Sequence, residues 1–211
     1  MKKLISLALL LVMSALLLVS CGDEPKNPTT PLQYAEIDVR DYGKIIVALD
    51  ANTAPITVAN FVKLVNEGFY DGLTFHRIMA GFMIQGGDPN GNGKGGSEEK
   101  IKGEFASNGV ENNLAHTRGV ISMARSSVPA YYPEEYQQMA RDSASSQFFI
   151  MHADAPHLDG QYAAFGWVVE GMEVVDAIAE QAKPIDNNGT IPADQQPVIT
   201  SIKMIPVPTD C

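Results

Sequence analysis

The chain has 211 residues, of which 45% are hydrophobic and 19% charged, and this composition suits one folded domain with short terminal segments. The formal net charge is −10 and no cluster of basic residues is visible along the sequence. Nucleic acid is therefore excluded as an expected partner, because binding to phosphates requires clustered lysines and arginines.

The N-terminus has the pattern of an export signal. "MKK" precedes the apolar run "LISLALLLVMSALLLVS", and residues 18–21 (LVSC) resemble the lipobox of bacterial lipoproteins. We predict a signal peptide at 1–20, a lipid on Cys21 that anchors the chain to the membrane of a bacterial cell envelope, and a flexible, proline-rich tether at 21–33. An ordinary signal peptide or an uncleaved membrane helix is the alternative. A lipid on Cys21 would leave Cys211 without a partner, so no disulfide is expected.

The remaining segments predict short strands and two helices. Residues 34–40 and 44–50 flank the tight turn Asp41-Tyr42-Gly43 and indicate paired strands. A helical pattern follows, with Thr57 as a candidate N-cap and Gly68 as the stop signal. The further predicted elements are strands in 73–78, 82–85, 119–124, 147–151 and 163–169, a helix at 171–181 and a last strand at 196–207, before a tail at 208–211. This order favours a closed β barrel with helical plugs.

The stretch "FHRIMAGFMIQGGD" (75–88) places a permanent cation, Arg77, inside an apolar run. The pattern alone fits a structural role for Arg77, in a buried ion pair or on a surface strand, as well as it fits a functional one. In a strand, His76 points to the face opposite Arg77, and we interpret it as a structural residue. The glycine-rich stretch 86–96 lacks the order of a phosphate-binding loop, so a long turn-rich loop is expected. The histidines lack metal-ligand spacing, and neither a metal nor a cofactor is predicted.

Four separated motifs resemble the cyclophilins, a family of peptidyl-prolyl cis/trans isomerases. They are "FHRIMAGFMIQGGDPNGNGKGG" (75–96), "GVISMAR" (119–125), "SSQFFIM" (145–151) and "HLDGQYAAFGWVVEGMEVVDAI" (157–178). The resemblance covers nearly all of the domain at 34–207. It implies a mainly β fold, a closed eight-stranded antiparallel barrel capped by two helices. Together with the export signal it leads us to expect proline-containing exported polypeptides as substrates, and we expect a monomer.

The resemblance also assigns roles to individual residues of this chain. Arg77 matches the catalytic arginine, and Gln85 matches the glutamine that holds the substrate backbone and orients the arginine. Phe82, Met83, Phe149 and Leu158 match the pocket for the proline ring. Ala124 and Arg125 match the edge that pairs with the peptide, with Gln147 beside it. Tyr162 stands where many relatives have a histidine.

Two departures from the family pattern affect the expectations. His157 replaces the tryptophan of cyclosporin-sensitive members, so at most weak cyclosporin binding is expected. Residues 126–144 form an insertion relative to compact members, and its "PEEYQQMARD" portion is expected to form a short helix. We hypothesise that this insertion selects the residues that flank proline.

The chemistry explains why such a site needs a fixed cation. The amide bond before proline rotates over a barrier of roughly 18–20 kcal/mol. Twisting the bond localises a lone pair on the proline nitrogen, and a donor aimed at that nitrogen stabilises the twisted state selectively. A module that only binds proline-containing segments, as a chaperone does, is the alternative. A serine hydrolase is excluded because no nucleophile motif is present.

Overall fold

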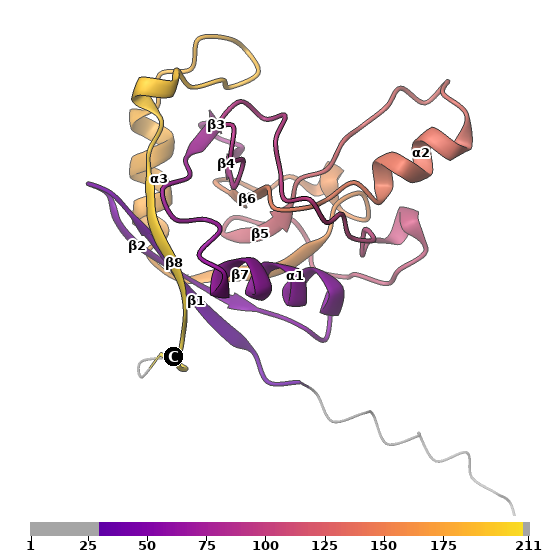
Figure 1. Ribbon diagram of the computed structural model, residues 1–211, viewed down its shortest axis with the longest axis horizontal. Coiled ribbons are helices and arrows are strands. Elements are labelled where there is room, and N and C mark those ends of the chain that lie inside the picture. Colours follow the sequence, from indigo (N-terminus) through magenta and orange to yellow (C-terminus); the bar gives the residue numbers. More distant parts are fainter. Residues whose placement is uncertain (1–29, 209–211) are drawn as a thin grey trace, which may run out of the picture.

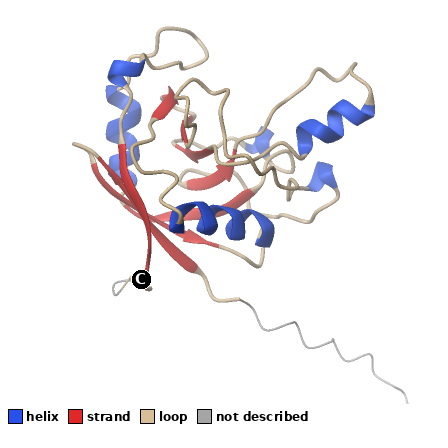
Figure 2. Cartoon of the chain, viewed as in Figure 1, coloured by secondary structure: helices blue, strands red, loops and turns tan. Residues whose placement is uncertain are grey.

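In the computed structural model, residues 30–208 are described, and Figures 1 and 2 show their arrangement. The predicted signal peptide, Cys21, most of the tether and Cys211 lie outside this range. No helix within residues 30–208 is both long and apolar enough to cross a membrane. The first strand begins at Gln33, and Thr30 just before it exchanges two hydrogen bonds of 2.7 and 2.8 Å with Asn52.

A single curled antiparallel sheet forms the frame of the molecule (Figure 2). Its eight strands lie side by side in the order β3-β4-β6-β5-β7-β2-β1-β8. They are β1 (Gln33–Val39), β2 (Gly43–Leu49), β3 (Phe75–Met79), β4 (Met83–Gly86), β5 (Val120–Met123), β6 (Phe148–Met151), β7 (Ala164–Glu170) and β8 (Ile199–Ile205). The mainly β, antiparallel fold expected from the sequence is confirmed.

The two edge strands of the sheet, β3 and β8, approach each other without forming a regular ladder. Thr74 and Val198 form an isolated bridge next to them. Phe75 N donates to the carbonyl oxygen of Pro197 at 2.9 Å, and Ile199 N donates to that of Leu73 at 2.8 Å. The sheet is therefore strongly curled, and full closure into a barrel stays a prediction.

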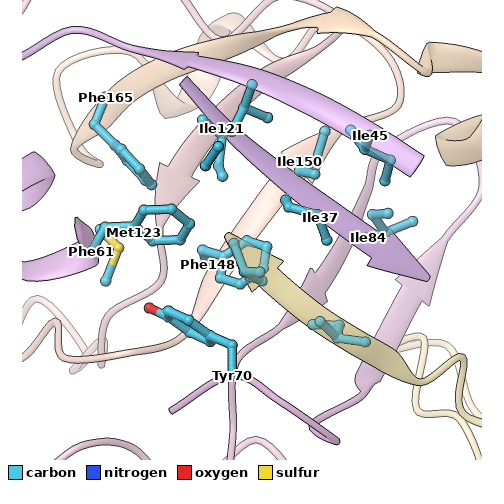
Figure 3. Packing of buried hydrophobic residues seen from close by; sticks show 14 of the residues in the cluster. Ile37, Ile45, Phe61, Tyr70, Ile84, Ile121, Met123, Phe148, Ile150 and Phe165 are labelled. Atoms are coloured by element: carbon cyan, nitrogen blue, oxygen red, sulfur yellow. The ribbon is translucent and has the colours of Figure 1, made fainter. Parts of the chain in front are cut away.

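The core lies inside the curl of the sheet. Figure 3 shows isoleucines of five strands and the aromatic rings of Phe61, Tyr70, Phe148 and Phe165 packed together. The ring of Phe61, from the first helix, lies with its centroid 5.3 Å from Tyr70, 5.7 Å from Phe148 and 5.3 Å from Phe165. Each such fully buried side chain contributes about 1.5–3 kcal/mol to folding. This packing makes the sheet a rigid support for the side chains on its other face.

The first helix, α1 (Pro55–Asn66), begins before the predicted N-cap. Ala54 is the N-cap and Pro55 the first helical residue, so the assignment of Thr57 as N-cap is wrong. The buried carboxylate of Glu104, from a distant loop, accepts hydrogen bonds from Ile56 N at 3.0 Å and from Thr57 N at 2.7 Å. A negative charge at this end also complements the helix dipole. A tertiary contact therefore replaces the local cap that the sequence suggested.

The molecule contains three α-helices within residues 30–208, one more than the resemblance implied. The helix predicted at 171–181 is α3 (Met172–Gln181). The additional one, α2 (Glu134–Arg141), lies in the insertion, where a short helix was expected. Ser126 N donates to Ser143 Oγ at 2.8 Å and ties the two ends of the insertion together. Figure 1 shows α2 projecting away from the sheet.

Candidate active site

Arg77 reaches the site because β3 is irregular. The register between β3 and β4 shifts between Phe75 and Arg77, where Arg77 pairs with Gln85. Phe75 and Ile78 both belong to the core, whereas Arg77 lines a surface cavity. We expected His76 on the face opposite Arg77 because side chains alternate along a regular strand. The register shift means that strict alternation does not hold at this point. His76 is only 3% exposed and lies beneath the glycine-rich loop, with its Nε2 atom close to Gly93.

The predicted site residues come together around one cavity of about 180 Å³. The cavity is lined by Arg77, Phe82, Met83, Gln85, Ala124, Arg125, Phe149, Leu158 and Tyr162. Strands β3, β4 and β6, the turn before β4 and the segments after β5 and β6 supply these residues, which are far apart in the sequence. Of the ten residues that the resemblance selected, only Gln147 lies outside this cavity, and it lines the adjoining one.

One wall of the cavity is apolar and tightly packed. Met83, Phe149 and Leu158 are 1%, 5% and 8% exposed. The ring of Phe149 meets that of Tyr162 edge-on at 5.8 Å between centroids. Phe82 stacks on His157, the residue in the tryptophan position, at 5.9 Å. Such a wall suits a small apolar ring, because its own side chains are already held by their neighbours.

Behind this wall, sequence reasoning missed a hydrogen-bonded polar chain that is buried at His116 and Ser122 and reaches the surface at Asp159. His116 stacks on Phe149 at 6.1 Å between ring centroids. Its Nδ1 lies 2.9 Å from an oxygen of Asp159, and its Nε2 lies 3.1 Å from Ser122 Oγ. His116 is 1% and Ser122 0% exposed, so this serine is no nucleophile for an external substrate. Burial lowers the pKa of His116, which keeps the imidazole neutral behind the apolar wall.

The guanidinium of Arg77 is held from two sides. Its Nε donates to the carbonyl oxygen of Asn188 at 2.7 Å, and Nη1 donates to Gln85 Oε1 at 3.1 Å. Gln85 Nε2 donates in turn to Gln147 Oε1 at 2.9 Å, and Gln147 Nε2 donates to the carbonyl oxygen of Gly95 at 2.7 Å. Burial lowers the pKa of Arg77, but an arginine keeps its charge in proteins. The cation is thus fixed in place beside the apolar wall.

The loop that carries Asn188 was not assigned to the site from the sequence. Asp186 Oδ1 accepts hydrogen bonds from Asn188 N and Thr190 N, both at 3.0 Å. Gly189 has a φ of 85° and its carbonyl oxygen accepts from Ile78 N at 2.8 Å, next to Arg77. The "DNNG" pattern predicts such a turn. Nothing in the pattern says that the turn lies against β3.

A second cavity of about 430 Å³ adjoins the first and shares Gln85, Ala124 and Arg125 with it. Its other lining residues are Gly93, Lys94, Gly95, Gly96, Lys100, Ser126, Ser143, Ser145 and Gln147. The glycine-rich stretch expected as a turn-rich loop therefore forms one wall. The opposite wall comes from both ends of the insertion.

Arg125 lines both cavities. Its guanidinium carbon lies 4.8 Å from the centroid of Tyr162 and 5.2 Å from that of Phe105. The same side chain donates to the carbonyl oxygens of Gln161 and Ser126, both at 2.9 Å. A lysine could not make these planar contacts, so Arg125 is a rigid part of the groove.

Comparisons with known proteins agree with this geometry. Residues 34–204 match the family model of the cyclophilin type peptidyl-prolyl cis-trans isomerase/CLD. A peptidyl-prolyl cis-trans isomerase of Helicobacter pylori is 44% identical over 149 residues, which cover 70% of this chain and 81% of that protein. Peptidyl-prolyl cis-trans isomerase A of Dickeya dadantii is 43% identical over 169 residues, which cover 77% and 80%.

Solved structures give the same family. The crystal structure of a cyclophilin type isomerase of Cryptosporidium parvum has a TM-score of 0.68 and 30% identity, over 84% of this chain and all of that one. A structure of the same protein in the presence of the dipeptide Ala-Pro has a TM-score of 0.66 and 29% identity, over 82% of this chain and 99% of that one.

The family match and the neighbour studied with Ala-Pro place the chain in a class of proteins that act on proline-containing peptides. The chain belongs to the cyclophilin family, and it is a peptidyl-prolyl cis-trans isomerase. The family and the enzymatic activity that the resemblance implied are confirmed. The alternative of a module that only binds proline-containing segments is therefore dropped.

Proposed function

We propose that the cavity beside Arg77 binds the proline ring of a substrate and that Arg77 is the catalytic residue. The observation that carries this proposal is the position of the Arg77 guanidinium, held by Asn188 and Gln85 beside the apolar wall. The wall of Phe82, Met83, Phe149 and Leu158 holds the ring while the preceding carbonyl group turns. The Nη atoms of Arg77 donate toward the lone pair that forms on the proline nitrogen as the bond twists.

The energetics of the reaction fit this arrangement. No covalent bond is broken, so the barrier falls only through interactions that are stronger in the twisted state than in the planar one. A planar amide nitrogen offers no lone pair, whereas the twisted nitrogen accepts a hydrogen bond. A fixed donor in a partly desolvated site requires no reorganisation at that moment, and it therefore stabilises the twisted state selectively.

Gln85 and Gln147 have a positioning role in this proposal. The chain of hydrogen bonds from Arg77 through Gln85 and Gln147 to Gly95 restrains the guanidinium on the side that faces the second cavity. The backbone of Ala124 and Arg125 lies at the boundary of the two cavities and pairs with the peptide. Tyr162, packed against Phe149 and Arg125, closes the remaining side.

The N-terminal sequence supports a proposal about the cellular role. We propose that the chain acts as a monomer on exported polypeptides at a bacterial membrane, held there by a lipid on Cys21 and the tether at 21–33. The lipobox-like residues 18–21 and the apolar run before them support this proposal. Several acyl chains on one cysteine suffice for stable anchoring.

The test is metabolic labelling of the full-length protein with a labelled fatty acid, followed by fractionation. We expect label and isomerase activity on an Ala-Pro peptide together in the membrane fraction. Cys21→Ala should lose the label and leave the membrane, while its activity on the peptide persists. A Cys21→Ala protein that stays in the membrane would instead indicate an uncleaved N-terminal helix.

A further inference from the structure

The two adjoining cavities carry a charge opposite to that of the whole protein. The chain has 25 aspartates and glutamates against 15 lysines and arginines. Within residues 30–208, no carboxylate side chain lines either cavity, whereas four cations do: Arg77, Lys94, Lys100 and Arg125. A groove with this composition on an acidic protein attracts negative charge and repels positive charge.

These cations are not neutralised by partners. Across the described part of the chain, no carboxylate oxygen lies within ion-pair distance of any of the four. The carboxylates close to the groove are engaged elsewhere or exposed. Asp88 accepts hydrogen bonds from the backbone of its own loop, and Asp186 accepts one from Asn188 N. Glu99 pairs with Lys63 at 2.7 Å, and Asp142 accepts a hydrogen bond from Gly103 N. Glu98 is exposed.

Two of the four cations differ from the others in their freedom. Arg77 and Arg125 are half-buried and tied to backbone carbonyl groups, so they belong to the rigid groove. Lys94 and Lys100 are exposed and make no hydrogen bond through their ammonium groups within residues 30–208. A lysine ammonium on a flexible stem is a point charge that can follow a ligand. These two lysines are therefore available to a substrate side chain.

The position of the second cavity relates it to the residues near proline. Both cavities share Gln85, Ala124 and Arg125, so a peptide with proline in the first has the second within reach of its neighbouring residues. An extended chain advances about 3.3–3.6 Å per residue, so a residue only a few positions from the proline reaches an adjoining cavity.

We propose that Lys94 and Lys100 make the second cavity a subsite for an acidic side chain. The enzyme then selects prolines that have an aspartate or a glutamate two or three residues away. This proposal rests on the proline-binding site described above and adds a choice of substrate to it.

The experiment compares three peptide series with the full-length protein, measured by NMR exchange between cis and trans forms. Each series carries Glu, Gln or Lys at the same position, two or three residues before or after a central Ala-Pro. We expect kcat/KM to be about 3–10-fold higher for Glu than for Gln on at least one side of the proline, and lower for Lys, given that each exposed ion pair contributes about 1.5–5-fold. The Glu/Gln ratio should fall towards one between about 10 mM and 1 M salt, because salt screens exposed charges.

The variants assign the effect to the two lysines. Lys94→Gln/Lys100→Gln should bring the Glu/Gln ratio close to one. The matched control, Arg40→Gln/Lys183→Gln, removes the same charge from two exposed cations outside both cavities and should keep the wild-type ratio.

The ratio is internal to each variant, so a change in overall activity does not affect it. A wild-type ratio of one on both sides, a ratio that Lys94→Gln/Lys100→Gln leaves intact, or a preference for lysine would each overturn the proposal. If the wild-type protein failed to isomerise the neutral Gln peptides, that result would instead contradict the proline site in the first cavity. The two proposals therefore fail in different ways.

Discussion

The two cavities differ in how their walls are built. Most of the first cavity's wall comes from β3, β4, β6 and the turns beside them, and its wall residues pack against each other and against buried neighbours. The second takes most of its lining from the loop before η1 (Ala106–Asn108, a 3₁₀ turn) and from the insertion, and most of its residues are glycines, serines and lysines. The first places a charge and an apolar surface within fixed distances. The second offers hydrogen bonds and mobile charges around a larger space.

This difference indicates that the first cavity serves catalysis and the second serves substrate selection. Selective stabilisation of a twisted bond requires a donor whose position does not change, and strands supply such positions. Discrimination among neighbouring residues tolerates more freedom, and loops supply that. We therefore expect changes in the first cavity to lower the rate for every peptide and changes in the second to alter the ranking of peptides.

The largest effect is expected for Arg77→Ala. It removes the donor and should lower kcat/KM on an Ala-Pro peptide by about 10²–10³-fold, as the loss of one preorganised donor typically does. Arg77→Lys should recover little, because a point charge lacks the fork that contacts both Asn188 and Gln85.

The measurement is exchange NMR at several peptide concentrations, with thermal unfolding as the check on folding. Arg40→Ala, which removes an exposed cation outside the site, is the control and should keep the wild-type rate. Wild-type activity in a folded Arg77→Ala protein would contradict the proposed mechanism.

The second effect concerns the loop that holds Arg77. In Gly189→Ala the new methyl group would lie 2.7 Å from the carbonyl oxygen of Ile78, so the loop must move and carry Asn188 away from Arg77. A displaced guanidinium should lower kcat by about 10–100-fold, with a smaller change in KM.

Gly109→Ala is the matched control, because Gly109 has a similar positive φ of 72° but open space around it. Both substitutions impose left-handed strain of about 1–2 kcal/mol, and only Gly189→Ala adds the collision. The NMR signal of the Arg77 Nε–H group is an independent readout. In Gly189→Ala this group should lose its protection from solvent exchange, and in Gly109→Ala it should keep it. Equal kinetics in the two variants would show that this loop does not position Arg77.

The strands were predicted well, because apolar runs and turns are local patterns; two runs around the turn at residues 41–43 predicted β1 and β2. The residues around the first cavity were predicted from the resemblance of separated motifs to a known family, because no local pattern shows that these motifs meet. Contacts between distant segments were harder. Thr57 has the side chain of an N-cap, but the cap is the carboxylate of Glu104, 47 residues away along the chain. Asn188 contributes a backbone carbonyl oxygen, for which no side-chain motif exists. The β irregularity that separates Phe75 from Arg77 likewise depends on pairing with β4.

The smallest effect is expected for His76, which lies beneath the wall of the second cavity. Neither of its ring nitrogens has a hydrogen-bond partner in the described part of the chain, and it is 3% exposed. Burial is the main cause that lowers its pKa, against the opposing influence of the Asp88 carboxylate. The unfolded chain, with a histidine pKa near the ordinary value of about 6.5, therefore binds a proton before the folded protein does.

This difference in proton binding determines how pH changes the stability of the fold. As the pH falls below about 6.5, the unfolded state takes up more protons than the folded state, so the free energy of unfolding decreases. His76→Gln removes this contribution. We expect the difference in melting temperature between wild type and His76→Gln to shrink between pH 7.5 and pH 5, measured by thermal unfolding at each pH. His116, also buried with a lowered pKa, should maintain part of the slope in the variant.

The His76→Gln variant also tests whether catalysis in the first cavity is independent of the second cavity. If the first cavity works independently, folded His76→Gln should isomerise an Ala-Pro peptide at pH 7.5 within about twofold of wild type, as expected for a residue that touches no reacting group. Parallel melting curves at all pH values would contradict the assignment of the pH effect to His76. A loss of rate comparable to that of Arg77→Ala, in a protein that remains folded, would mean that the floor of the second cavity also fixes the catalytic arginine.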